Sequence, residues 1–233
     1  MGKYLLERFR SPEELAQAAA DKWIERLQKA QGAAHRVALS GGRISRVFFA
    51  AVTERVRKKR ISLDSVHFFW ADERCVPPNH DESNFLLAYD QLLGPTRVPD
   101  ANIHRIHGED PPVTAAQLAS AEFQRIVPSN TAGVPILDIA FLGMGEDGHV
   151  ASLFPPPETA PHTGVYVPVI ASKPPPERIT LTFPVLESAK EAWVLVSGAG
   201  KEEALCDSIA PDGKTPLAHL IRQRTLTRVL TNI

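Results

Sequence analysis

One loop of the chain carries a histidine next to a carboxylate. Residues 137–149 read LDIAFLGMGEDGH, an apolar run followed by glycines, Asp147 and His149. Gly148 allows a sharp turn, so both side chains can project from one loop. Histidine has an ordinary pKa of about 6.5 and can take a proton from water, while a nearby carboxylate fixes its tautomer. We therefore predict that His149 is a general base oriented by Asp147. The alternative is a structural histidine that caps a turn.

Two glycine loops have the composition of anion-binding sites. SGGR at 40–43 and SGAGK at 197–201 each follow an apolar run and precede a helical pattern. Backbone N–H groups at a helix start attract anions such as phosphate, and Lys201 adds a positive charge. Two such sites favour a phosphorylated ligand, although a plain tight turn remains the alternative for SGGR.

A fourth polar segment, ADER at 71–74, also follows an apolar run. Arg74 can clamp a phosphate or stabilise an oxyanion, and Asp72 can bond sugar hydroxyls or the loop backbone. A loop held by salt bridges is the alternative.

Other classes of site lack support. GMGEDG at 143–148 formally matches GxGxxG, but no carboxylate follows about 20 residues later, and three prolines at 155–157 interrupt the expected helix. Neither glycine loop is a Walker motif, and no GxSxG or HExxH sequence occurs. These patterns therefore disfavour a nicotinamide cofactor, ATP hydrolysis, a catalytic metal and a covalent serine mechanism.

The elements around these loops alternate between strand and helix patterns. Such alternation predicts a three-layer α/β/α fold, a mostly parallel Rossmann-like sheet with helices on both faces, formed as a single domain by residues 1–233. Ligands of such sheets bind beyond the carboxyl ends of the strands. Strands are predicted at 35–42, 66–74, 137–143, 165–170, 191–198 and 227–233, helices at 11–30, 46–56, 83–93, 114–127 and 201–209, and a short helix from Ser152; the segment 178–186 is a further apolar run.

Composition sets broader expectations. The 233 residues are 43 % hydrophobic and 23 % charged with a net charge of −1, which indicates a globular protein without affinity for nucleic acid or membrane. The basic run at 55–60 is interpreted as a solvated helix end. Two distant cysteines and a charged N-terminal segment favour the cytoplasm. The expected assembly is a monomer or a weak homo-oligomer.

Taken together, these segments resemble the 6-phosphogluconolactonase family, which is related in fold to glucosamine-6-phosphate deaminases. The resemblance covers nearly the whole chain and is carried by ALSGG at 38–42, FFWADERCVPPNHDESNF at 68–85, NIHRIHGE at 102–109, LGMGEDGHVASLFP at 142–155, RITLTFPVL at 178–186 and GAGKEEAL at 198–205. It implies hydrolysis of 6-phospho-D-glucono-1,5-lactone to 6-phospho-D-gluconate in the oxidative pentose phosphate pathway, without a cofactor.

The resemblance also implies roles for individual residues. His149 matches the general base, and Asp147 orients it. The matching anion-binding set comprises Arg74, Lys201, the amides of Gly41 and Gly42, and Arg178 as a further member. Ser40, Arg43, Asp72 and Gly145 complete the predicted substrate-binding residues.

Three differences from related patterns matter. The deaminases typically read DEY where this chain has Asp72, Glu73 and Arg74, and they have a phenylalanine, asparagine and glutamate run at 152–154, where this chain reads SLF. The lactonases usually continue SGG with serine, threonine and proline, whereas this chain has RIS at 43–45. Arg43 either replaces the lost hydroxyl with charge or points to solvent. The alternative functions are a deaminase-type isomerase and a non-catalytic sugar-phosphate sensor.

Overall fold

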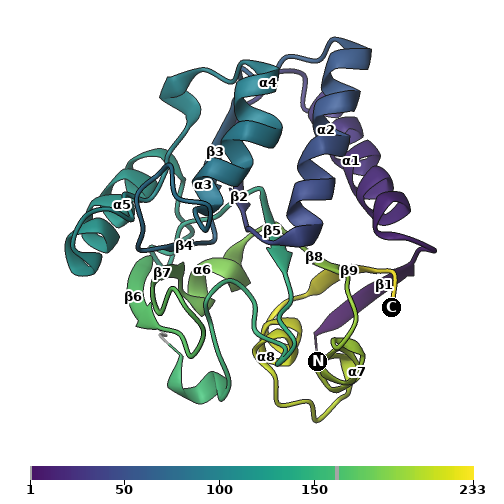
Figure 1. The fold of residues 1–233 in the computed structure, drawn as a ribbon, viewed down its shortest axis with the longest axis vertical. Helices are drawn as coiled ribbons and strands as arrows, with labels where there is room; N and C mark the ends of the chain where they lie inside the picture. The colour runs from purple at the N-terminus through teal and green to yellow at the C-terminus, as the bar shows by residue number, and fades with distance from the viewer. Residues whose placement is uncertain (1, 161–162) are drawn as a thin grey trace.

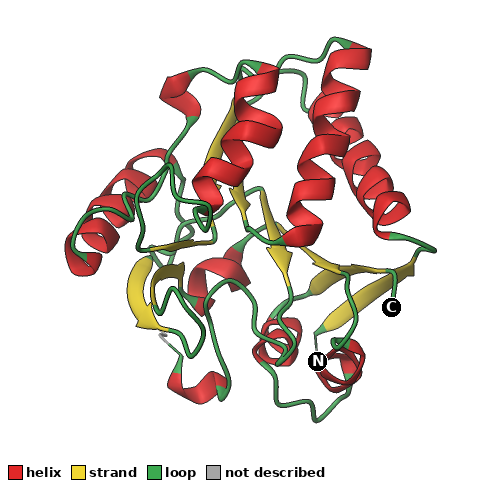
Figure 2. Ribbon diagram, viewed as in Figure 1, coloured by secondary structure: helices red, strands yellow, loops and turns green. Residues whose placement is uncertain are grey.

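The main sheet has six parallel strands in the order β1-β9-β8-β5-β2-β3 (Figures 1 and 2). The computed structural model describes residues 2–160 and 163–233. This sheet confirms the prediction of a mostly parallel α/β fold. Its strands are β1 (Lys3–Arg8), β2 (His35–Leu39), β3 (Val66–Trp70), β5 (Ile139–Gly143), β8 (Glu191–Val196) and β9 (Leu226–Thr231).

Helices cover both faces of this sheet. Figure 1 shows α1 (Pro12–Lys29) and α2 (Arg43–Lys59) on one side, and α6 (Phe183–Ser188), α7 (Glu202–Ile209) and α8 (Pro216–Gln223) on the other. Between sheet and helices the core is aromatic: the rings of Trp23 and Phe141 lie 5.1 Å apart, and those of Phe141 and Trp193 5.5 Å apart. Apolar strands and apolar helix faces meet there, which explains the three layers.

A second, antiparallel sheet was not predicted. It has the order β4-β7-β6, with β4 at Asp72–Arg74, β7 at Glu177–Leu181 and β6 at Tyr166–Ile170. The single strand predicted at 66–74 is therefore wrong. The chain changes sheets at Ala71. Its N–H donates to the Leu39 carbonyl in the main sheet at 2.7 Å, and its own carbonyl accepts from the Leu181 N–H in the second sheet at 2.8 Å.

Several helix boundaries follow from capping. Ser11 Oγ accepts from the Glu14 N–H at 3.2 Å and starts α1 as predicted. Ser83 caps the segment predicted at 83–93, since its Oγ accepts from Leu86 N at 3.2 Å. The basic run at 55–60 ends α2 and is mostly exposed, as expected. The Ser83-capped segment comprises α3 (Asn84–Ala88), the π-helical η1 (Tyr89–Leu93) and α4 (Gly94–Thr96); the remaining helices are η2 (Asp100–Asn102), α5 (Pro112–Ile126) and η3 (Pro157–Thr159).

Other expectations fail for identifiable reasons. The sequence did not predict β1, α6 or α8, and the first residues of α6 were counted with the apolar run at 178–186. β1 is an edge strand that pairs with β9, near the other end of the chain. Its formation depends on this distant contact, so the local sequence pattern does not predict it. The short helix expected from Ser152 does not form. The Ser152 N–H donates to Thr180 Oγ1 at 3.2 Å and the Ser152 hydroxyl donates to Asp72 at 2.7 Å, so both groups are held by contacts with distant segments. The prediction that residues 1–233 form a single domain stays a prediction.

A chain of hydrogen bonds between β3 and α5 makes stability depend on pH. His67 Nδ1 lies 3.0 Å from His104 Nε2, and His104 Nδ1 lies 2.8 Å from Glu122 Oε1. Burial lowers the pKa of both histidines below the ordinary histidine value of about 6.5. The unfolded chain therefore binds more protons, so this contribution to stability is lost as the pH falls through about 6.5.

We expect the melting temperature of His67→Asn to fall less than that of the wild type between about pH 7.5 and about pH 5.5. Thermal unfolding followed by circular dichroism measures this difference. His107→Asn is the control, because that side chain is 49 % exposed. An equal fall in wild type and His67→Asn would contradict the prediction.

Candidate active site

A pocket of about 150 Å³ opens where the carboxyl ends of β2, β5 and β8 meet the second sheet. All the predicted site residues except Asp147 line this pocket, although they come from five separate segments of the chain. Asp147 lies behind His149 and contacts it. The lining residues are Ser40, Gly41, Gly42, Arg43, Ile44, Asp72, Arg74, Asn84, Gly143, Met144, Gly145, His149, Ala151, Arg178, Ser197 and Lys201.

The histidine loop follows β5 and is closed by its own backbone. Gly145 N donates to the His149 carbonyl at 2.9 Å, and Gly148 adopts a φ of +77°, the sharp turn expected from the sequence. His149 Nδ1 lies 2.5 Å from Asp147 Oδ1. When Nδ1–H donates to this carboxylate, Nε2 keeps its lone pair and can accept a proton.

The environment of Asp147 keeps its carboxyl charged. Burial opposes ionisation, but the hydrogen bond and the electrostatic attraction of the His149 ring, together with two backbone N–H groups, lower the pKa of Asp147 to about 2. The carboxylate can therefore stabilise the imidazolium that forms when His149 accepts a proton. The same ring packs against Phe154, with centroids 4.8 Å apart.

The loop between β2 and α2 presents free polar groups to the pocket. Ser40 is 6 % exposed, and its Oγ has no hydrogen-bond partner among the described residues. Gly42, with a φ of +96°, is the N-cap of α2 and supplies no side-chain cap, so the first N–H groups of the helix are available to an anion. Arg43 is exposed yet lines the pocket, while Ser45 turns its hydroxyl to the Gly41 carbonyl at 2.9 Å.

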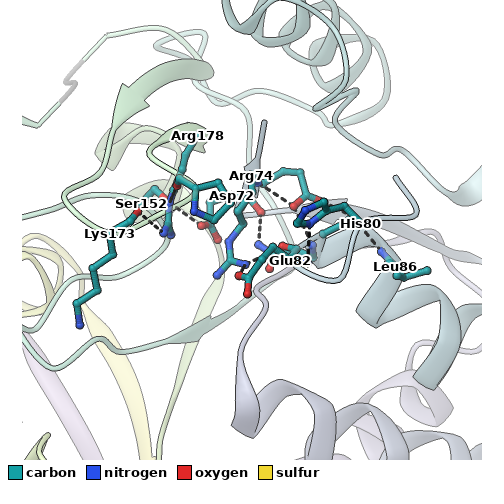
Figure 3. A network of polar contacts seen from close by, with 12 residues as sticks. Asp72, Arg74, His80, Glu82, Leu86, Ser152, Lys173 and Arg178 are labelled. Atoms are coloured by element: carbon teal, nitrogen blue, oxygen red, sulfur yellow. Dashed lines mark hydrogen bonds and ion pairs between the residues drawn. The ribbon is translucent and has the colours of Figure 1, made fainter. Parts of the chain in front are cut away.

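Three further cations face the pocket. Lys201 stands at the N-terminus of α7, where burial and the charge of Arg43 lower its pKa. Arg178 is 8 % exposed, and burial and the charge of Arg74 lower its pKa too. Figure 3 shows how both arginines are held: Arg74 Nη1 donates to the carbonyl and carboxylate of Glu82 at 2.7 and 2.9 Å, and Arg178 Nη2 donates to the Lys173 carbonyl at 3.4 Å. Such crowded positive charge favours an anionic ligand.

Two buried residues join the walls of the pocket. Asp72 is 5 % exposed and accepts from Ser152 Oγ at 2.7 Å (Figure 3). Asn84, which the sequence reading missed, is 3 % exposed, and its Nδ2 donates to the Asp72 carbonyl at 2.8 Å. A Cβ on Gly41 would lie 1.7 Å from Asn84 Oδ1, so only glycine fits there. The segment 83–93 was predicted only as a helix, so Asn84 at its start was not singled out as a pocket residue.

Residues 2–160 and 163–233 contain no group of three or more His, Cys, Asp or Glu side chains arranged to hold a metal ion. In the same part of the chain, no helix combines the length and apolar character needed to cross a bilayer.

A family model and individual relatives assign the chain to the same family. The model of the family described as glucosamine-6-phosphate isomerases/6-phosphogluconolactonase matches residues 10–229. The chain is 40 % identical over 162 residues to "6-phosphogluconolactonase 3, chloroplastic" of Arabidopsis thaliana, covering 65 % of this chain and 49 % of that protein. It is 38 % identical over 178 residues to the 6-phosphogluconolactonase of Treponema pallidum, covering 76 % of this chain and 72 % of that protein.

A solved structure agrees over nearly the full length. The 6-phosphogluconolactonase of Thermotoga maritima matches with a TM-score of 0.82 and 25 % identity, covering 99 % of each chain. The chain spans 49 % of the Arabidopsis relative and 63 % of the rice proteins named "Probable 6-phosphogluconolactonase 3, chloroplastic", less than two thirds of their length. The family match and the similarity to the Treponema protein establish that this chain belongs to the 6-phosphogluconolactonase family, within the wider group of glucosamine-6-phosphate isomerases and 6-phosphogluconolactonases.

Proposed function

We propose that the protein hydrolyses 6-phospho-D-glucono-1,5-lactone to 6-phospho-D-gluconate. The observation that carries this proposal is the His149–Asp147 pair, joined at 2.5 Å, at a pocket lined by four cationic side chains. The relatives named as 6-phosphogluconolactonases support the same substrate.

In the proposed reaction His149 is the general base. Its Nε2 takes a proton from a water molecule while the water oxygen attacks the lactone carbonyl carbon, and Asp147 stabilises the resulting imidazolium. The carbonyl oxygen becomes an oxyanion, which the cations of the pocket stabilise. When the tetrahedral intermediate collapses, the bond from the carbonyl carbon to the ring oxygen breaks. The imidazolium then returns its proton to that oxygen, which leaves a hydroxy acid.

The phosphate group requires a separate anion site. We assign it to the Ser40–Arg43 loop and Lys201, because the N-termini of α2 and α7 and the unpartnered Ser40 hydroxyl converge there. On this assignment Arg43 replaces with charge the hydroxyl that this chain lacks. Arg74 and Arg178, paired across β4 and β7, supply positive charge from another wall of the pocket.

Two alternative functions have less support. A solved glucosamine-6-phosphate deaminase shares the fold with a TM-score of 0.80, but at 16 % identity it indicates the fold alone. At the positions where deaminases carry phenylalanine, asparagine and glutamate, Ser152 bonds Asp72 and Phe154 packs on His149. A non-catalytic sensor has no need of a charged Asp147 held against His149.

The direct test is hydrolysis of freshly prepared 6-phosphogluconolactone, coupled to 6-phosphogluconate dehydrogenase and corrected for spontaneous opening. Rapid loss of lactone, with glucosamine 6-phosphate unchanged in parallel, would support the proposal. Turnover of glucosamine 6-phosphate would favour the isomerase. Binding of 6-phosphogluconate without turnover would favour the sensor.

The fit of the histidine ring against the loop leads to a further prediction. A Cβ at Gly145 would lie 2.1 Å from two atoms of the His149 ring, so Gly145→Ala must displace this ring. A displacement of about 1 Å can reduce turnover about 100-fold, and we expect kcat to fall by that order. Steady-state kinetics of lactone hydrolysis measures it. Gly32→Ala controls for a general loss of stability: its φ of +80° strains alanine, but Gly32 does not line the pocket, so kcat should stay that of the wild type. Wild-type kcat in Gly145→Ala would contradict the prediction.

The cytoplasmic location stays a prediction, since the plant relatives are named as chloroplastic. The prediction of a monomer or weak homo-oligomer also stays open to test.

A further inference from the structure

Glu73 is a buried carboxylate next to the pocket that lines none of it. It is the central residue of β4 and is 2 % exposed. Successive side chains on a strand point to opposite faces. Asp72 and Arg74 therefore line the pocket, while Glu73 points away from it.

Four hydrogen-bond donors surround this carboxylate. Oε1 accepts from the backbone N–H groups of Arg74 and Asn84, both at 2.8 Å. Oε2 accepts from Phe85 N at 2.7 Å and from Ser83 Oγ at 3.2 Å. One side chain thus joins β4 to the first turn of α3, across the loop of residues 75–82.

Holding a carboxylate here carries an energetic cost. Burial raises the pKa of Glu73 to about 7 against the lowering effect of three backbone N–H groups, and the negative charge of Asp72 adds to the rise. No salt bridge to Glu73 is present among the described residues. A buried carboxylate without a cation is costly to hold, and the four hydrogen-bond donors around Glu73 offset that cost.

The donors connect Glu73 to the pocket. Arg74 and Asn84 both line it, and the Asn84 side chain bonds the Asp72 carbonyl and fills the space beside Gly41. Glu82, at the end of the same loop, holds the Arg74 guanidinium (Figure 3). A movement of the α3 start relative to β4 would therefore shift two walls of the pocket together.

We propose that Glu73 is a positioning residue, which fixes Arg74 and Asn84 through their backbone N–H groups and thereby sets the affinity of the pocket for its anionic ligand. The substrate named in this inference rests on the proposed function. Glu73 itself does not touch the substrate.

Glu73→Gln tests this inference without changing the shape of the side chain. The amide oxygen can still accept from two donors, but its NH₂ group faces the Phe85 N–H and leaves that buried donor without an acceptor. We expect Kd for 6-phosphogluconate and KM for the lactone to rise about tenfold, with kcat within about threefold of the wild type. Isothermal titration calorimetry and steady-state kinetics measure these quantities.

Asp81→Asn is the matched control, because it removes an exposed carboxylate from the same loop. Its Kd and KM should equal those of the wild type. A merely structural role of Glu73 would lower the melting temperature but leave Kd unchanged well below it. Unchanged Kd in folded Glu73→Gln would therefore overturn the inference.

A second measurement uses the wild-type protein and applies even where Glu73→Gln fails to fold. Native-state hydrogen exchange should show slow exchange of the Arg74, Asn84 and Phe85 amides. Binding of 6-phosphogluconate should slow this exchange further, because hydrogen bonds to Glu73 that favour ligand binding are in turn stabilised by the bound ligand. Fast exchange, or no response to ligand, would overturn the inference. If the wild type lacks lactonase activity, the proposed function fails. The role of Glu73 is then decided by the Kd for inorganic phosphate, which should be higher in Glu73→Gln than in the wild type.

Discussion

His149→Ala is expected to lower kcat for 6-phosphogluconolactone by about 10²- to 10⁴-fold, the range typical of a lost general base. The ring is 27 % exposed and lines the pocket, and its Nδ1 is held 2.5 Å from Asp147. Removal of the ring takes away the proton acceptor but leaves the cations in place. Kd for 6-phosphogluconate should therefore stay close to that of the wild type, which calorimetry can establish beside the coupled assay.

His107→Ala is the control for this substitution, since that histidine is exposed and does not line the pocket. Its kcat should be that of the wild type. Turnover that persists in His149→Ala would end the role assigned to His149. Loss of both turnover and product affinity would show instead that the ring holds the ligand, and the general-base assignment would again fail.

Lys201→Met is expected to raise KM for the phosphorylated lactone by roughly 10- to 100-fold, the loss that follows from removing a hydrogen bond to a charged group. Methionine keeps most of the length and volume of lysine but no charge. Because the phosphate lies away from the reacting carbon, the interaction binds ground state and transition state alike, so kcat should change little.

Hydrolysis of unphosphorylated glucono-1,5-lactone tests whether Lys201 acts on the phosphate group or on the reacting carbonyl. Lys201→Met should leave hydrolysis of that lactone unaltered, since the group that Lys201 binds is missing. Lys214→Met is the control, because Lys214 is an exposed lysine that does not line the pocket. An equal loss on both lactones would place Lys201 at the reacting carbonyl instead of the phosphate.

Both predictions rest on residues that the sequence alone singled out. The strand-loop-helix order, the glycine turn at Gly148, and the motifs around Asp147, His149 and Lys201 are local patterns. Local patterns report backbone conformation and helix starts directly, which is why the α/β class, the helix at 11–30 and the histidine loop could all be predicted. The rule that ligands bind at the carboxyl ends of parallel strands then brought the candidate residues to one edge.

Tertiary structure decided what depends on contacts between distant segments. β1 exists because it pairs with β9 at the other end of the chain, and β4 leaves the main sheet because Ala71 bonds Leu39 on one side and Leu181 on the other. Asn84 enters the pocket only because Gly41 leaves room for it, and Glu73 is buried only because α3 folds over it. These contacts join groups far apart in sequence, so their energies leave no periodic trace in either segment. The sequence therefore determined the kind of chemistry and the loops that carry it, and the tertiary structure decided which walls surround them and what holds those walls in place.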